Sequence, residues 1–147
     1  MRKPIKRYIR TIPSAKKRTW KKKSKSERSN LIKQCDDIFR EIIRRRDNWT
    51  CQRTGYRGKN MDVAHFFPRD NKRVRWDEDN ACLLKKGIHK YWAHSKHEEF
   101  RDFWISRIGK ERFERLKLRS QVRGTIYTHE LKVIKIGLEI RLEGMKK

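Results

Sequence analysis

Two histidines and one asparagine are the residues of this chain whose types and order could carry chemistry. They are His65, which ends a short apolar run, Asn80, which follows an acidic turn, and His89, which opens an aromatic-rich segment. An imidazole titrates near neutral pH and can take a proton from an attacking water, and a second imidazole can help to hold a divalent cation against a phosphate. An asparagine amide can hold a loop in place. Together these side chains could activate a water and hold a cation against a phosphate, which is the chemistry that hydrolysis of a phosphodiester needs.

We expect His65 to be the general base and His89 to bind a single Mg²⁺ or Mn²⁺, because these hard cations also accept phosphate oxygens. The cation would need further ligands, for which Asp62 and Asp79 are the candidates. Asn80 is expected to hold the loop between the strand that carries His65 and the helix that carries His89.

The composition points to a polyanionic partner. The chain has 42 Lys and Arg against 18 Asp and Glu, a formal net charge of +24 at pH 7. Cationic side chains release counterions from phosphates, so DNA or RNA is the expected partner, and arginine forks suit phosphate geometry. The residues expected to contact DNA are Arg69, Arg73, Arg75, Lys85, Lys86, Arg44, Arg45, Lys21, Lys22 and Lys23.

Other function classes are disfavoured. No apolar run is long enough to cross a membrane, and the first residues lack the apolar centre of a secretory signal. The three cysteines are an odd number without a paired framework, which is typical of a reducing compartment. We therefore expect a cytoplasmic protein. An RNA-binding, ribosome-associated protein would explain the charge but not the histidines.

The elements that must position these residues follow from composition and hydrophobic spacing. Residues 1–29 hold thirteen Lys or Arg and one acid, which indicates a flexible basic arm. Apolar residues then recur every three or four positions, which predicts a helix over 30–46 capped by Ser29. The remaining chain, 30–147, is expected to form one domain with its core at about 49–95.

Within that core, β-prone residues around Trp49 and Val63 predict two short strands. The segment after Pro68 is predicted to be a basic loop, with a short strand over 74–76 as an alternative. Residues 86–118 are then predicted to be helical, with a break at Gly109. The flanking helix within this stretch is expected over 96–118, and its His94 and His97 are expected to be exposed to solvent.

The segment 128–143 allows two interpretations. Apolar and polar residues alternate through its middle, which favours a strand. Leu131, Ile134 and Leu138 also lie on one face of a helix that Thr128 could cap. The pattern alone favours the strand. We nevertheless predict a helix, because of the resemblance that follows.

From about residue 29 to residue 120 the chain resembles the NinG (Rap) recombination nucleases of lambdoid phages, members of the HNH or ββα-metal superfamily. That family has a leading helix, a Cys-x-x-Cys knuckle, a D-x-x-H-F-x-x-R segment, an R-[WYF]-D-E-x-N turn, and a second Cys-x-x-Cys that runs into the catalytic helix. The corresponding segments here are CQRT at 51–54, DVAHFFPR at 62–69, RWDEDN at 75–80, and KKGI at 85–88 followed by His89. The resemblance implies an α+β fold with a ββα-metal (HNH) core, flanking helices, a basic N-terminal arm and a closing helix.

The chain departs from this pattern at the structural zinc site of the family. Of the four cysteine positions only Cys51 is kept, and Thr54, Lys85 and Ile88 occupy the others. Structural zinc needs four nitrogen or sulfur ligands, so we expect none here. Instead we predict that apolar side chains fill the place of the metal. These are Trp49, Val63, Leu84, Ile88 and Trp92.

A second departure lies beside the expected base. Many HNH enzymes carry Asp or His immediately before it as a metal ligand, and this chain has Ala64. The resemblance implies a metal-dependent DNA endonuclease that acts on branched recombination intermediates such as Holliday junctions and D-loops. Two alternatives stay open, a nicking HNH enzyme of the homing or packaging type and a DNA-binding protein that has lost catalysis. Symmetric cleavage of a junction would call for a homodimer, but no stretch of the sequence indicates a dimer interface.

Overall fold

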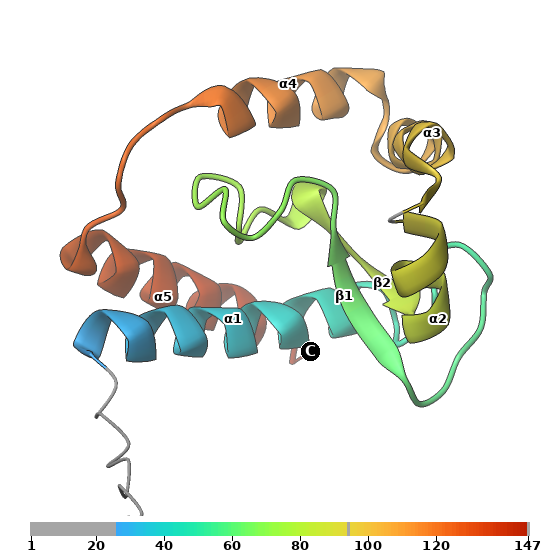
Figure 1. Ribbon diagram of the computed structural model, residues 1–147. Coiled ribbons are helices and arrows are strands. Elements are labelled where there is room, and N and C mark those ends of the chain that lie inside the picture. Colours follow the sequence, from blue (N-terminus) through green and yellow to red (C-terminus); the bar gives the residue numbers. More distant parts are fainter. Residues whose placement is uncertain (1–25, 94, 147) are drawn as a thin grey trace, which may run out of the picture.

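The computed structural model describes residues 26–93 and 95–146, and they form an α+β structure (Figure 1). At the centre lies one antiparallel pair of strands, β1 (Met61–His65) and β2 (Ala81–Lys85). The register pairs His65 with Ala81 and Met61 with Lys85. Five α-helices accompany this hairpin in the described residues. The expected basic residues Lys21, Lys22 and Lys23 lie outside the described part of the chain, as does His94.

Strand β2 is buried on both faces, which the sequence did not reveal. Ala81 and Leu83 pack towards the first helix with Phe39, whereas Cys82 and Leu84 pack on the opposite side against aromatic residues of later helices. Side chains alternate between the two faces of a strand, so a strand covered on both sides is apolar throughout. The sequence pattern leaves 81–85 unassigned, because a short apolar run has neither the period of a half-buried strand nor that of a helix.

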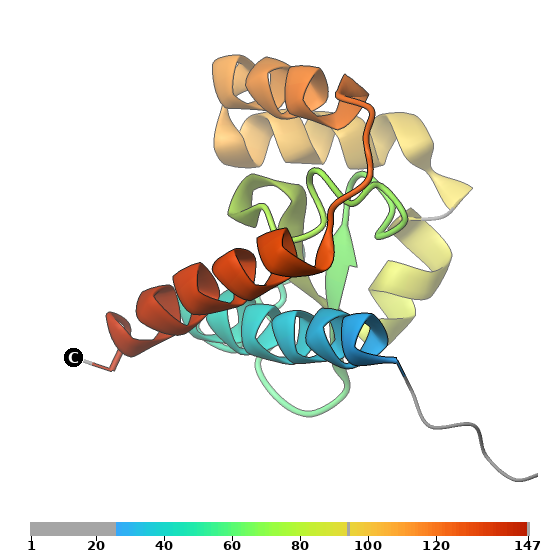
Figure 2. The same ribbon diagram turned by 90° about the vertical axis from the view of Figure 1, so that its left-hand side faces the viewer.

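Two helices that are far apart in the sequence pack side by side below the hairpin. They are α1 (Glu27–Arg46) and α5 (Thr128–Glu143), which lie together in both views (Figures 1 and 2). Leu31 and Leu131 share a buried cluster, and the Cys35 thiol lies 3.8 Å from the Leu131 carbonyl oxygen. The predicted helix over 128–143 is therefore confirmed, and the strand alternative is wrong.

The remaining helices follow β2. A short helix α2 (Lys86–Ile88) continues into a π-helical segment η2 (His89–Ala93), and then come α3 (His97–Ile108) and α4 (Lys110–Gln121). The predicted break at Gly109 is confirmed, since its φ of 84° is a conformation that glycine adopts without strain. A single 3₁₀ turn, η1 (Glu78–Asn80), leads into β2.

Three predicted local features are wrong. The first helix is capped by Ser26 and already includes residues 27–29, which had been assigned to the arm. The predicted strand near Trp49 is reduced to one bridge between Thr50 and Arg57, because Trp49 has a positive φ of 53°, which a strand cannot accommodate. Residues 74–76 form a turn rather than a strand.

None of the helices in the described residues is long and apolar enough to cross a membrane.

Candidate functional site

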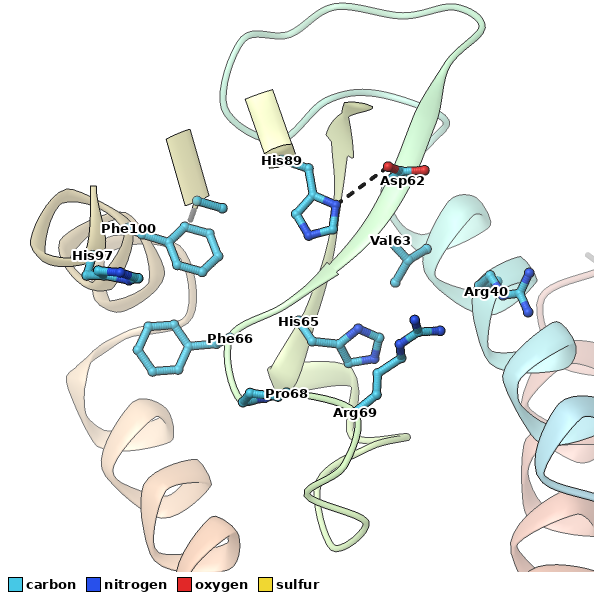
Figure 3. Close-up of a pocket in the computed structure, with 11 residues that line it drawn as sticks. Arg40, Asp62, Val63, His65, Phe66, Pro68, Arg69, His89, His97 and Phe100 are labelled. Atoms are coloured by element: carbon cyan, nitrogen blue, oxygen red, sulfur yellow. Dashed lines mark ion pairs between the residues drawn. The ribbon is translucent and has the colours of Figure 1, made fainter. Parts of the chain in front are cut away.

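An open pocket of about 780 Å³ lies beside β1 (Figure 3). Strand β1 contributes Asp62, Val63 and His65 to its wall, and η2 contributes His89. The loop after β1, helix α1 and helix α3 complete the lining. Their residues include Arg69, Arg40 and His97. The hairpin and the helix that follows it thus bring two of the three predicted catalytic residues to one pocket.

His65 ends β1 and is held in one orientation. Its Nε2 lies 3.1 Å from the backbone carbonyl oxygen of Arg75. A carbonyl oxygen can only accept, so in this contact Nε2 carries the hydrogen and donates it. In a neutral ring the lone pair then resides on Nδ1. The ring is also 5.9 Å, centroid to centroid, from the ring of Phe39.

The environment of His65 keeps the imidazole neutral. Burial lowers its pKa to about 4, and the positive charges of Arg69 and Arg75 act in the same direction. The hydrogen bond to the Arg75 carbonyl and the charge of Asp36 oppose this shift without cancelling it. At neutral pH the ring can therefore accept a proton.

The carbonyl that orients His65 belongs to a residue that is itself fixed. The Arg75 guanidinium donates from Nε and Nη2 to the two carboxylate oxygens of Asp36, at 2.8 and 2.6 Å, and from Nη1 to the Arg69 carbonyl. Trp76 donates to the same carboxylate. These contacts lower the pKa of Asp36 despite its burial. Arg75 was expected to contact DNA, but the structure places its guanidinium in an internal ion pair.

Asn80 is fully buried and does not line the pocket. Its Oδ1 accepts from the backbone N–H of Phe67 at 2.8 Å, and its Nδ2 donates to the carbonyls of Phe67 and Val74. The amide therefore joins both ends of the loop that carries Arg69 to the start of β2. Asn80 positions the loop and does not itself face the pocket.

His89 and Asp62 meet at one end of the pocket. Nδ1 of His89 lies 3.6 Å from Oδ2 of Asp62, and both side chains are partly exposed. Figure 3 shows this pair above His65, with the Arg69 side chain beside the His65 ring. One imidazole and one carboxylate are thus presented to the space beside the neutral His65.

Asp79, the other predicted metal ligand, does not join them. Its carboxylate is paired with Arg112 and Arg119 of α4, and the residue does not line the pocket. No group of three or more His, Cys, Asp or Glu side chains in the described residues forms a metal cluster. Mg²⁺ is usually held by one or two carboxylates, waters and substrate phosphates, so Asp62 and His89 fit such an ion as a partial ligand set.

The predicted DNA-contacting residues are spread over several surfaces. Among those in the described part of the chain, only Arg69 lines the large pocket. Arg73 lines a second, smaller pocket of about 280 Å³ together with Lys72 and Arg123. Lys85 and Lys86 are exposed at the start of α2. At the end of α1, Arg44 lies over the ring of Trp49, and Arg45 pairs with Glu41.

Residues 51–56 form a tight turn at the position of the zinc knuckle of the resembling family. Cys51 is buried, its N–H donates to the Tyr56 carbonyl, and its carbonyl accepts from Gly55. Burial raises the pKa of the Cys51 thiol, but hydrogen bonds from the Thr54 side chain and from backbone N–H groups, including that of Lys85, outweigh it and lower the pKa.

The predicted apolar filling of this region is correct only in part. Leu84 is buried in the same cluster as Cys51, and Trp92 packs against that cluster. Trp49 is 45% exposed, and Val63 packs on the other side of the hairpin. Backbone hydrogen bonds of Cys51 to Tyr56 and Gly55 close the turn, and the apolar cluster buries the Cys51 side chain.

The sequence patterns did not assign two of the polar residues that line the pocket, Arg40 and His97, to the site. Arg40 comes from the middle of α1, where helical spacing signals only a polar face. His97 opens α3 and is exposed, as expected, yet it also lines the pocket. Neither has a spacing to His65 that could have indicated this.

Comparisons with protein-family models, curated proteins and solved structures found no match to this chain.

Proposed function

We propose that this protein is a metal-dependent DNA endonuclease of the HNH, or ββα-metal, type that resembles the NinG recombination nucleases. One observation carries the proposal: a neutral, oriented His65 lines the same pocket as the His89–Asp62 pair. An antiparallel hairpin followed directly by a helix supplies these residues, which is the element order that the superfamily name describes.

His65 would act as the general base. A base must be unprotonated and within reach of the attacking water, and the low pKa of His65 meets the first condition at neutral pH. A phosphodiester that pairs with Arg69 would neutralise part of the charge that lowers this pKa. We therefore expect the basicity of His65 to increase when DNA is bound.

His89 and Asp62 would hold a Mg²⁺ or Mn²⁺ ion, with phosphate oxygens and water completing its shell. Such an ion, when bound, supplies positive charge to the phosphate and to the leaving oxygen. Arg69 and Arg40 would orient the phosphate, because their side chains enter the pocket and a guanidinium matches phosphate geometry. Asn80 would hold the loop that presents Arg69.

The substrate class is argued from the resemblance and the charge. We propose branched DNA, such as a four-way junction, and the basic second pocket around Arg73 and Arg123 supports contact with a strand outside the cleavage pocket. A nicking enzyme that acts on linear duplex is the alternative within the same chemistry. Comparing cleavage of a junction and a matched duplex distinguishes the two.

Replacing the proposed base tests the function. The purified protein is incubated with a synthetic four-way junction in Mg²⁺, in Mn²⁺ or in EDTA, and His65→Ala is compared with the wild type. Loss of a general base lowers the rate by about 10²- to 10⁴-fold. We expect this loss with little change in DNA affinity measured in EDTA.

His129→Ala is the matched control, because His129 is an exposed histidine on α5. This variant should cut DNA at the wild-type rate. Cleavage by His65→Ala at the wild-type rate would show that another group is the base.

Two observations favour a second candidate, a DNA-binding protein without catalysis. The described residues contain no cluster of three metal-binding side chains, and the buried Ala64 precedes His65. If the wild type binds the junction but cuts neither DNA in either cation, this second function replaces the first.

A further inference from the structure

Helix α5 carries an apolar stripe on the side that faces away from α1. Its inner face, with Leu131 buried, packs against α1. Three large apolar residues on the outer side are exposed: Val133 at 69%, Ile136 at 56% and Ile140 at 68%. They stand three and four positions apart and so form a continuous stripe on a helix. A helix that is apolar on both sides is typical of one covered on both sides.

The stripe has a centre where another backbone could approach closely. Gly137 lies between Ile136 and Ile140. Apart from the backbone of α5 itself, no atom of the described residues lies within 4 Å of the place where its side chain would start. A glycine in a helix interior destabilises the helix relative to alanine. In the part of the chain that the structure describes, no side chain fills the space it leaves. A helix packed across the stripe would use it.

One edge of the stripe carries a lysine and two glutamates, which could pair with the same edge of a second copy. Lys132 lies at one end, and Glu139 and Glu143 lie at seven and eleven positions further along, which places the three on one side of the helix. If two copies of α5 cross antiparallel about Gly137, each Lys132 faces Glu139 and Glu143 of the other. All three are paired only in exposed bridges within the chain, such as that of Lys132 with Glu27.

On the opposite edge of the stripe, the charged side chains Arg141 and Glu130 already have hydrogen-bond partners within the chain. Arg141 donates to both carboxylate oxygens of Glu78, and Glu130 accepts from the Tyr127 N–H. If two copies of α5 packed in parallel, the edge with Arg141 and Glu130 of one copy would face Lys132 of the other. In the antiparallel arrangement the edge with Lys132, Glu139 and Glu143 meets the same edge of the second copy. Each Lys132 can then pair with a glutamate of the other copy.

We propose that the outer face of α5 is a homodimer interface, in which two copies pack α5 against α5 antiparallel through Val133, Ile136, Gly137 and Ile140. This inference does not depend on the proposed function. The contact is small for a permanent assembly, so the dimer is expected to be reversible and to dissociate on dilution. Because each copy carries a net charge of +24, added salt should strengthen the association by screening repulsion.

Sedimentation velocity of the full chain, freed of nucleic acid, tests this over about a hundredfold range of protein concentration. We expect the wild type to shift from monomer to dimer with increasing concentration and with increasing salt. Ile140→Asp should stay monomeric throughout. Leu118→Asp on α4 is the matched control, because Leu118 is 65% exposed outside the stripe, and this variant should dimerise like the wild type.

A wild type that stays monomeric at the highest concentration overturns the proposal, whether the face is bare or covered by another part of the chain. Dimerisation of Ile140→Asp at the wild-type concentration overturns it too, because the interface would then lie elsewhere. Circular dichroism of each variant verifies that the helices are retained.

A charge exchange tests the antiparallel arrangement. Lys132→Glu should weaken the dimer, since Glu would then face Glu139 and Glu143 of the other copy. The double variant Lys132→Glu, Glu139→Lys should recover association. If the double variant is as weak as the single one, the helices do not cross as proposed.

Discussion

His65 illustrates how one side chain is prepared by its neighbours before any substrate arrives. The Arg75 carbonyl fixes its tautomer, and burial keeps it neutral. Arg75 in turn is held by Asp36 of α1. A protonated His65 would have to be accommodated against the charges of Arg69 and Arg75, so the folded protein resists its protonation.

This resistance predicts a pH dependence of stability. An unfolded histidine takes up a proton below about pH 6.5, whereas folded His65 does so only near pH 4. Between these values the unfolded state binds more protons, so the free energy of unfolding decreases as the pH falls from 6.5 to 4. Urea unfolding of the wild type across this range should show the loss.

His65→Gln should reduce that loss, because glutamine does not titrate. His129→Gln, a substitution of an exposed histidine, should leave it unchanged. An equally steep pH dependence in His65→Gln would assign the acid sensitivity to another group.

For individual residues, the sequence predicted most of the polar side chains that line the pocket but not all of their ion-pair partners. His65, His89 and Asp62 were identified from their order and neighbours, and they line one pocket. Asp79 and Arg75 were assigned to the site as well, yet each is engaged by a residue more than thirty positions away, Arg112 and Asp36 respectively. Such pairings depend on how helices dock, which no local pattern encodes.

Among the elements, the turn at 51–56 is closed by backbone hydrogen bonds of Cys51 with Tyr56 and Gly55. Interactions with Thr54 and with the backbone of Lys85 lower the pKa of the Cys51 thiol against the effect of its burial. Residues 54 and 85 therefore lie near the thiol.

This geometry makes a gain of zinc binding testable. The triple variant Thr54→Cys, Lys85→Cys, Ile88→Cys, which retains Cys51, supplies four thiolates at the positions expected from the resemblance. We expect it to bind one Zn²⁺, and its thermal unfolding temperature to rise on adding zinc and fall on adding a chelator. The wild type should show neither change. A triple variant that folds but does not bind zinc would place residue 88 away from the thiol.

The elements that sequence patterns predicted correctly are those with long-range periodicity or a clear breaker. Helix α1 and the break at Gly109 belong to this class. Strand β2 was missed because the ACLLK segment at 81–85 is short and covered on both faces, so alternation was absent. For α5, alternation pointed to the wrong structure because the helix has apolar residues on two opposite faces.

At the scale of the whole molecule, charge should govern DNA affinity. The +24 net charge predicts that the logarithm of the DNA association constant falls linearly with the logarithm of salt concentration. Each phosphate contact adds about 0.9 to the magnitude of the slope. Arg69→Ala should therefore reduce the slope by about one unit.

Fluorescence anisotropy in EDTA, over a series of salt concentrations, measures this slope. Lys146→Ala, which removes an exposed cation paired with Glu143, is the control and should keep the wild-type slope. An unchanged slope in Arg69→Ala would mean that Arg69 does not contact a phosphate.

The packing of α5 on α1 has a consequence for the order of events during synthesis. The Cys35 contact with Leu131 joins residues 96 positions apart, so the part of α1 that packs on α5 stays uncovered until residue 131 has left the ribosome. Asp36, which secures Arg75 and through it His65, lies on that same helix. In a nascent chain α1 would therefore gain its full packing, and the pocket beside β1 its final wall, only after α5 has emerged.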